Sequence, residues 1–333
     1  TYVNYNDPRL IEKYYSQMKE WFKYVDKYTV DGLLKRWPDT KYRDWYLGDW
    51  LAPMGVDAGN QASVDLVSNC FISECLSTMY KTAITLGKRE EAEEFAIRRE
   101  KLNKLIHQTF YRADEGIYST GSQLDMCYPM LVGVVPDSLY NKVKENVVAM
   151  TEEKYKGHIA VGLVGVPILT EWAVRNKQVD FFYQMMKKRD YPGYLYMIDH
   201  GATATWEYWS GERSRVHNCY NGIGTWFYQA VGGIRLDEAK PGYRHFYVDP
   251  QIPNGVTWAK VTKESPYGTI AVNWKLKDDN QLNLQLTVPA GTTATVCIPN
   301  NAVSCKKNKK KVSVKEQTVD VEAGHYDFLF NLK

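Results

Sequence analysis

The sequence predicts two successive domains, an array of helical hairpins followed by a β-sandwich. Its 333 residues suffice for about two domains at roughly 150 residues each. Apolar residues recur at three- and four-residue steps up to Pro241, and short alternating segments separated by turn residues follow it. We therefore place a helical domain at residues 1–240 and a β-sandwich at residues 241–333.

Caps and breakers define the expected helices. Asp7-Pro8 opens the first helix with a capping side chain and a proline at the first helical position, and this helix is expected to end near Tyr28. Gly87 separates the next two helices, which predicts an antiparallel hairpin. Further expected helices span residues 63–86, 89–111, 122–132, 137–152, 163–176, 178–189 and 218–232.

Alternating segments predict the strands of the second domain, at residues 246–248, 256–262, 269–276, 281–288, 293–298, 311–314 and 326–332. A basic cluster, Lys306, Lys307, Lys309, Lys310 and Lys311, lies between two strand-like runs. A solvated hairpin tip explains it better than a nucleic-acid site, because the formal net charge of the whole chain is only +3.

Composition excludes several classes of protein. No stretch approaches the roughly 18 apolar residues of a membrane span. The six cysteines form no CxxC pair, and no phosphate-binding, zinc-protease or serine-hydrolase motif stands in a convincing context, so we expect neither a metal nor an organic cofactor. The N-terminus lacks an initiator Met and a signal peptide, and we expect the chain to begin inside a longer protein.

Two segments rich in aromatic residues are the candidate binding loops. The chain has 25 Tyr and 10 Trp, whose flat rings suit the apolar faces of sugars, although large helical proteins also use them as core. The first segment, residues 37–50, contains Trp37, Trp45, Asp49 and Trp50. These tryptophans either form a binding surface or close the end of a helical bundle.

The second segment places a carboxylate among aromatic rings. Glu207 lies between Trp206 and Tyr208, which would partly desolvate its carboxylate and suit a general base, and His217 follows ten residues later. A sugar hydrolase needs a carboxylate to activate water and aromatic walls to orient the ring. The alternatives are a helix N-terminal carboxylate for Glu207 and a buried core histidine for His217.

The residues around Glu207 resemble a known family. Asp199-His200-Gly201-Ala202-Thr203-Ala204-Thr205-Trp206-Glu207 is similar to the central motif of the bacterial α-L-rhamnosidases of glycoside hydrolase family 78. The match continues in order through His217, Trp226-Phe227-Tyr228, Gly233-Ile234, Pro241-Gly242-Tyr243 and Glu264-Ser265-Pro266-Tyr267-Gly268, and it includes Gly48-Asp49-Trp50-Leu51. The resemblance thus covers nearly the whole chain.

The resemblance implies an (α/α)6 barrel, incomplete at its N-terminus, followed by a C-terminal β-sandwich. It also implies inverting hydrolysis of terminal α-L-rhamnosides, with Glu207 as the general base. Asp49, Trp50, His217 and Trp206 would bind the sugar, and Trp37 and Trp45 are weaker matches because their loop does not align unambiguously. The family's general acid lies in a DER-x-GW-like segment that this chain does not reproduce, so half of the catalytic pair is expected to be absent.

Two functions remain open. One is the C-terminal portion of an α-L-rhamnosidase that acts on a rhamnose-containing glycan or glycoside. The other is a carbohydrate-binding or catalytically inactive relative with the same fold. Neither requires a nucleic-acid partner, and analogy with the family places the protein in the periplasm or outside the cell.

Overall fold

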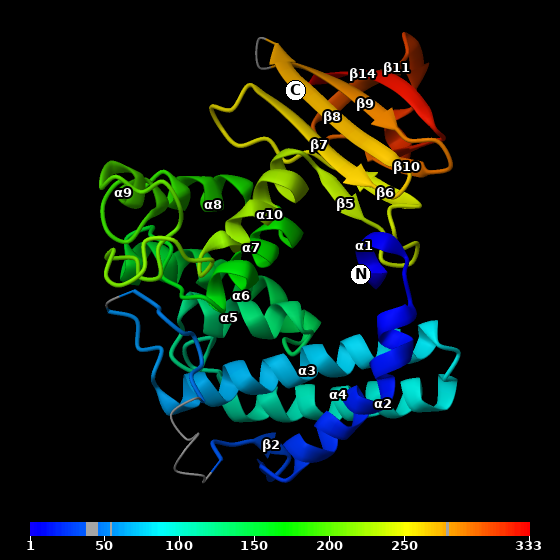
Figure 1. Cartoon of the computed structure of the whole chain (residues 1–333). Helices are drawn as coiled ribbons and strands as arrows, with labels where there is room; N and C mark the ends of the chain where they lie inside the picture. Colours follow the sequence, from blue (N-terminus) through cyan, green and yellow to red (C-terminus); the bar gives the residue numbers. More distant parts are fainter. Residues whose placement is uncertain (38–45, 54, 278–279) are drawn as a thin grey trace. The chain divides into compact units, whose positions relative to one another are not determined.

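The computed structural model describes residues 1–37, 46–53, 55–277 and 280–333. Their contacts divide the chain into two compact units, residues 12–223 and residues 1–11 together with 224–333. The first unit is mainly helical, and the second contains both larger β-sheets (Figure 1).

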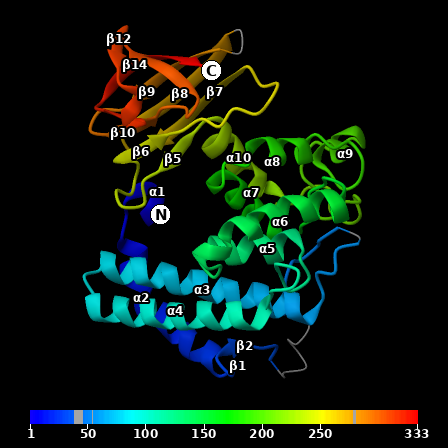
Figure 2. The same ribbon diagram turned by 180° about the vertical axis from the view of Figure 1, so that it is seen from behind.

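Three consecutive helical hairpins build most of the helical unit. The hairpins are α3 (Gln61–Thr85) with α4 (Arg89–Phe110), α5 (Gln123–Leu131) with α6 (Asp137–Tyr155), and α7 (Gly165–Arg175) with α8 (Val179–Met186). Helix α5 also packs against α3 and α7, so neighbouring hairpins share one core. Both ribbon views show α3 and α4 side by side (Figures 1 and 2).

The position of each helix in the array explains its sequence pattern. Helix α5 is packed against α3, α6 and α7, and all its residues from Gln123 to Met130 are buried. Helix α6 packs on one side only and buries Val143, Val147 and Thr151, which are four residues apart and form a single stripe. Because α5 also buries polar residues, each of these needs a hydrogen-bonding partner inside the protein.

The other unit contains a β-sandwich. One sheet has six strands in the order β12-β11-β14-β9-β8-β7, and the other has four in the order β13-β10-β6-β5. Alternation places Ile270, Val272 and Trp274 of β8 inside, with Leu282 and Leu284 of β9. The strands are β5 (Ile234–Leu236), β6 (His245–Val248), β7 (Trp258–Ser265), β8 (Gly268–Lys277), β9 (Gln281–Val288), β10 (Thr293–Cys297), β11 (Ala302–Lys307), β12 (Lys310–Val312), β13 (Thr318–Val321) and β14 (Gly324–Leu332).

Most expected elements are confirmed. The first long helix is α2 (Arg9–Asp26), and Asp7 Oδ1 accepts a hydrogen bond from Arg9 N as its capping residue, at 3.1 Å. Gly87 ends the α3 segment with a φ of 72°, which explains why glycine stops the helix there. The short elements α1 (Tyr2–Tyr5) and α9 (Tyr194–Asp199) were not among the expected helices.

The helix expected at residues 218–232 is wrong in its first half. The backbone of Tyr220 is held in a loop because its carbonyl accepts a hydrogen bond from Tyr194 Oη, at 2.8 Å. A 3₁₀ turn follows at Asn221–Ile223, then one α-helical turn, α10 (Gly224–Trp226), and a π-helical turn at Phe227–Val231. Strands β5, β11 and β13 were also missed, since they depend on pairing with neighbouring strands.

We predict that Asp125→Ala lowers the free energy of unfolding by about 3 kcal/mol, because it leaves buried donors without an acceptor. Ser63 Oγ donates to Asp125 Oδ1 at 2.6 Å, and Thr120 Oγ1 donates to Oδ2 at 2.7 Å. Urea denaturation followed by circular dichroism measures the loss. The matched control is Asp114→Ala, which removes an exposed carboxylate; equal losses in the two variants would contradict the prediction.

Candidate functional site

Glu207 lies in a loop whose two sides are joined by backbone hydrogen bonds. Glu207 N donates to Ser214 O at 2.9 Å, and His217 N donates to Thr205 O at 2.8 Å. The Glu207 side chain is 18% exposed. Its Oε2 accepts a hydrogen bond from Ser214 N at 3.3 Å, and Arg213 Nη1 lies 3.9 Å from Oε1. The Glu207 carboxylate is therefore held by a hydrogen bond and is still partly exposed to solvent. Glu207 is not at the N-terminus of a helix.

Aromatic rings lie beneath this loop. Trp206 and Trp209 are 2% and 1% exposed, so both are buried. The ring of Trp209 stacks on Tyr220 with centroids 4.1 Å apart and planes 20° apart. The guanidinium of Arg215 lies over Trp206, 5.1 Å from its ring centroid. In this arrangement the buried ring of Trp206 anchors the loop in the protein interior.

His217 is partly buried, and its ring orientation is set by its neighbour. Cys219 N donates to His217 Nδ1 at 3.1 Å. In the neutral imidazole an acceptor at Nδ1 requires the proton on Nε2. His217 Nε2 is then a hydrogen-bond donor, which suits a sugar hydroxyl.

Asp49 is buried, at 5% exposure, and both of its oxygens are bonded to backbone N–H groups. Gly165 N donates to Oδ1 at 2.8 Å, and Gly162 N donates to Oδ2 at 2.7 Å. Burial raises the pKa of Asp49 to about 7, although these two N–H groups act in the opposite direction. The carboxylate thus holds a backbone turn.

The other tryptophans of the first loop differ in their surroundings. Trp50 is 40% exposed, and its carbonyl accepts a hydrogen bond from Leu163 N at 2.7 Å. Trp37 is partly buried in an edge-on aromatic cluster with Tyr28 and Tyr46, at centroid distances of 6.1 and 5.5 Å. Trp45 lies outside the described residues.

Sequence reasoning missed the segment that joins the two loops, Val161–Gly165. Its Gly162 and Leu163 bind the first loop as described above, and Val161 O accepts a hydrogen bond from Trp209 Nε1 of the second loop, at 2.9 Å. A direct contact adds to these, since Tyr220 Oη donates to Leu51 O at 2.9 Å. The signal was a glycine pair: a Cβ at Gly162 would lie 2.2 Å from Trp50 O.

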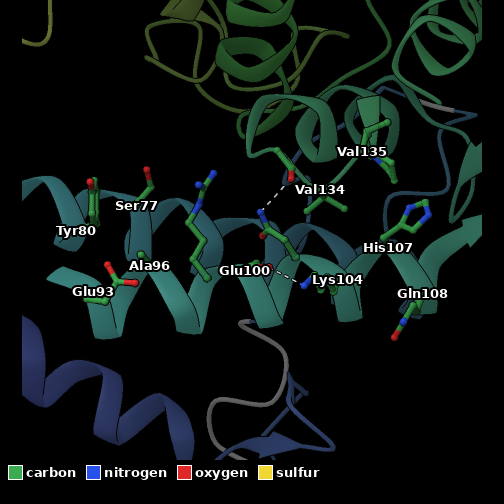
Figure 3. Close-up of a pocket in the computed structure, with 14 residues that line it drawn as sticks. Ser77, Tyr80, Glu93, Ala96, Glu100, Lys104, His107, Gln108, Val134 and Val135 are labelled. Carbon is green, nitrogen blue, oxygen red and sulfur yellow. Dashed lines mark hydrogen bonds and ion pairs between the residues drawn. The ribbon is translucent and has the colours of Figure 1, made fainter. Parts of the chain in front are cut away.

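A cavity of about 630 Å³ lies elsewhere in the helical unit, between α3, α4 and residues 133–136 (Figure 3). None of the candidate residues lines it. Its polar side chains serve the fold, since Asn103 Nδ2 donates to Val132 O at 2.9 Å and Arg99 Nη2 donates to the same carbonyl at 2.6 Å. Among the described residues, no group of three or more His, Cys, Asp or Glu is placed to hold a metal ion.

Family models match both parts of the chain. The model of the bacterial α-L-rhamnosidase six-hairpin glycosidase domain matches residues 1–231. The chain belongs to the bacterial α-L-rhamnosidase family. The model of the C-terminal domain of this family matches residues 233–313. Membership confirms the expected fold, a six-hairpin helical domain followed by a β-sheet domain.

Relatives of this chain are considerably longer than it. An α-L-rhamnosidase of Alteromonas sp. (strain LOR) is 25% identical over 98% of the chain and 36% of its own length. An α-L-rhamnosidase of Formosa agariphila is 27% identical over 98% of this chain and 37% of its own length. The chain therefore spans about a third of the length of these relatives.

Solved structures agree in fold. The α-L-rhamnosidase of Streptomyces avermitilis, solved with L-rhamnose, matches with a TM-score of 0.86 and 22% identity, over 98% of this chain and 31% of that one. The α-L-rhamnosidase of Dictyoglomus thermophilum matches with a TM-score of 0.88 and 21% identity, over 99% of this chain and 38% of that one. No helix in the described part of this chain is long and apolar enough to cross a membrane.

We predict that Gly162→Ala destabilises the chain and loosens both loops, because the new Cβ would displace the Trp50 carbonyl. Thermal unfolding and tryptophan fluorescence measure these effects. The control is Gly224→Ala, where a Cβ meets nothing within 4 Å. A melting temperature equally unchanged in both variants would refute the role of Gly162.

Asp49 should also give the protein a pH-dependent stability. Its pKa is about 7 in the folded protein, above the usual aspartate value of 3.8, so the folded state binds more protons between these two pH values. The contribution of the Asp49 proton to the free energy of unfolding is therefore full below pH 3.8 and is lost as pH rises through 7. Urea denaturation across this range should give a steeper decline for the wild type than for Asp49→Asn; parallel curves would contradict this.

Proposed function

We propose that the protein containing this chain is an inverting α-L-rhamnosidase that removes terminal α-L-rhamnosyl residues from a glycan or glycoside. Glu207 acts as the general base in this proposal. The observation that supports it best is the Glu207 carboxylate, which is held by Ser214 N and remains partly open to solvent, in a loop whose Trp206 and Trp209 are buried. A base with this exposure can bind a water molecule and a substrate.

The reaction requires a water molecule and two carboxyl groups. Glu207 takes a proton from the water, whose oxygen attacks the anomeric carbon as the glycosidic bond breaks. A second, protonated carboxyl group donates its proton to the leaving oxygen, and inverting enzymes hold the two groups roughly 6.5–9.5 Å apart. We place the second group outside residues 1–333, as the family resemblance implies.

Neighbouring residues would bind the sugar. We assign the exposed ring of Trp50 to the apolar face and methyl group of rhamnose, and His217 Nε2 to a hydroxyl. The buried Trp206 anchors the loop that carries Glu207. Asp49 was expected to touch the sugar, but its two backbone contacts favour a positioning role. Trp37 and Trp45 stay candidates for sugar binding.

The compartment is proposed from the family alone. By analogy with the family, we place the enzyme in the periplasm or outside the cell. Hydrolysis of this kind needs no organic cofactor.

We predict that Glu207→Gln lowers kcat by roughly 10²–10⁴-fold, because the amide cannot accept the proton of the water. Release of p-nitrophenol from p-nitrophenyl α-L-rhamnopyranoside measures the change, in the 333-residue chain and in the protein extended upstream. The matched control is Glu212→Gln, an exposed glutamate in the same loop.

The outcomes separate the two candidate functions. Activity that Glu207→Gln abolishes and Glu212→Gln preserves supports the proposal. Turnover unaffected by Glu207→Gln would refute the general-base assignment. An inactive extended protein that still binds L-rhamnose would instead support the carbohydrate-binding function.

A further inference from the structure

The solvent-facing side of the six-stranded sheet differs sharply from its inner side. Inward-facing residues of β8 and β9 are buried and apolar. Toward one end of β7, β8 and β9 the outward-facing residues are amides, lysines and one tryptophan, whereas the other end of this face carries Thr262, Glu264, Thr269, Ala271 and Thr287. We call the first of these ends the amide face, and its members are Trp258, Lys260, Asn273, Lys275, Lys277, Gln281, Asn283 and Gln285.

The pairing register brings these side chains together. Trp258 lies opposite Lys275, and Lys260 lies opposite Asn273. On the next strand, Asn283 lies opposite Lys275. Directly opposed residues of antiparallel strands have neighbouring side chains on the same face. Figure 1 shows β7, β8 and β9 as adjacent strands of this sheet.

Two concave regions lie along this face. One has a volume of about 450 Å³, and its lining includes Trp258, Lys260, Asn273, Asn283 and Gln285. The second, of about 330 Å³, is lined by Lys277, Asn280, Gln281, Asn331 and Leu332. Gln281 and Asn283 are alternate residues of β9, only about 7 Å apart along the strand. The two hollows can therefore accommodate one extended ligand.

The chemistry of the face suits a sugar chain. Trp258 is 63% exposed on the edge strand β7, so its indole ring can stack on a pyranose. Asn273 Oδ1 is shielded from solvent and has no hydrogen-bond partner among the described residues. A buried acceptor without a partner costs free energy, and rotation of the partly exposed Asn273 side chain, which lines the hollow, would let a sugar hydroxyl reach it. Amide groups that both donate and accept match hydroxyl groups.

Charge decides which kind of sugar chain fits. Within the described part of the chain, Lys260, Lys275 and Lys277 have no carboxylate within ion-pair distance. Two described carboxylates share this face of the sheet: Glu264 Oε1 of β7 accepts a hydrogen bond from Thr269 Oγ1 at 2.8 Å, and Asp327 Oδ1 of β14 accepts one from Gln285 Nε2 at 3.2 Å. Among the described residues of β7, β8, β9 and β14, these three lysines outnumber the carboxylates of Glu264 and Asp327 on this face, which favours an anionic ligand.

We propose that the amide face binds an acidic polysaccharide chain, with Trp258 stacking on a sugar ring, Asn273 and Asn283 bonding hydroxyls, and Lys260, Lys275 and Lys277 contacting its anionic groups. This site lies within the β-sandwich and is independent of Glu207. It would keep the protein attached to a polymer whether or not the chain itself hydrolyses it.

Native affinity electrophoresis of the 333-residue chain tests this proposal. The gels contain polygalacturonate as a carboxylated polymer, carrageenan as a sulfated polymer, or dextran as a neutral one. We expect retardation by at least one acidic polymer and little by dextran. Trp258→Ala should weaken binding roughly tenfold, and a Lys260→Ala and Lys275→Ala double variant should weaken it by a similar factor.

Matched controls separate a built site from general charge attraction. Trp21→Ala removes a half-exposed tryptophan of α2, and a Lys309→Ala and Lys310→Ala double variant removes two exposed charges from the β11–β12 hairpin tip. Both should bind like the wild type. The proposal is overturned if no acidic polymer binds, if dextran binds equally well, or if the controls lose as much affinity as the amide-face variants. Circular dichroism confirms that each variant is folded, and none of these measurements depends on catalysis.

Discussion

The buried carboxylate of Asp49 is the contact on which the candidate site depends. Its two oxygens accept hydrogen bonds from Gly162 and Gly165, and this fixes the turn at the start of α7. The same turn receives the indole of Trp209 at Val161 O. Two loops that are more than 150 residues apart in sequence are thus held by a single short segment between them.

Close packing around this segment explains its glycines and the unfavourable backbone angle of Leu51, which lies next to it. A side chain at Gly162 would overlap the backbone of the first loop, so only glycine permits the approach. Leu51 has a φ of 62°, an unfavourable value for a branched residue, and its carbonyl accepts the Tyr220 hydroxyl. The surrounding contacts maintain this conformation, which is typical of backbone next to a functional site.

The β-sandwich illustrates how one alternating pattern serves two purposes. Residues of one parity form the core with the four-stranded sheet, so they must be apolar. Residues of the other parity face solvent and are free to vary. On β7 to β9 the solvent-facing positions hold several amides and lysines around one exposed tryptophan. An edge strand needs only a few charged residues to avoid pairing with another molecule, so protection of the edge does not account for this set.

The sequence by itself determined the order of the longer helices and of most strands, because helix and strand periodicities, Gly87 and Asp7-Pro8 act locally. It also determined the family, through the run that ends at Trp206-Glu207. The tertiary structure decided the roles within the site. Asp49 and Trp50 are neighbours in sequence, yet one is buried against backbone N–H groups and the other has an exposed side chain. Their surroundings come from Gly162 and Leu163, and no local pattern can specify contacts over such a distance in sequence.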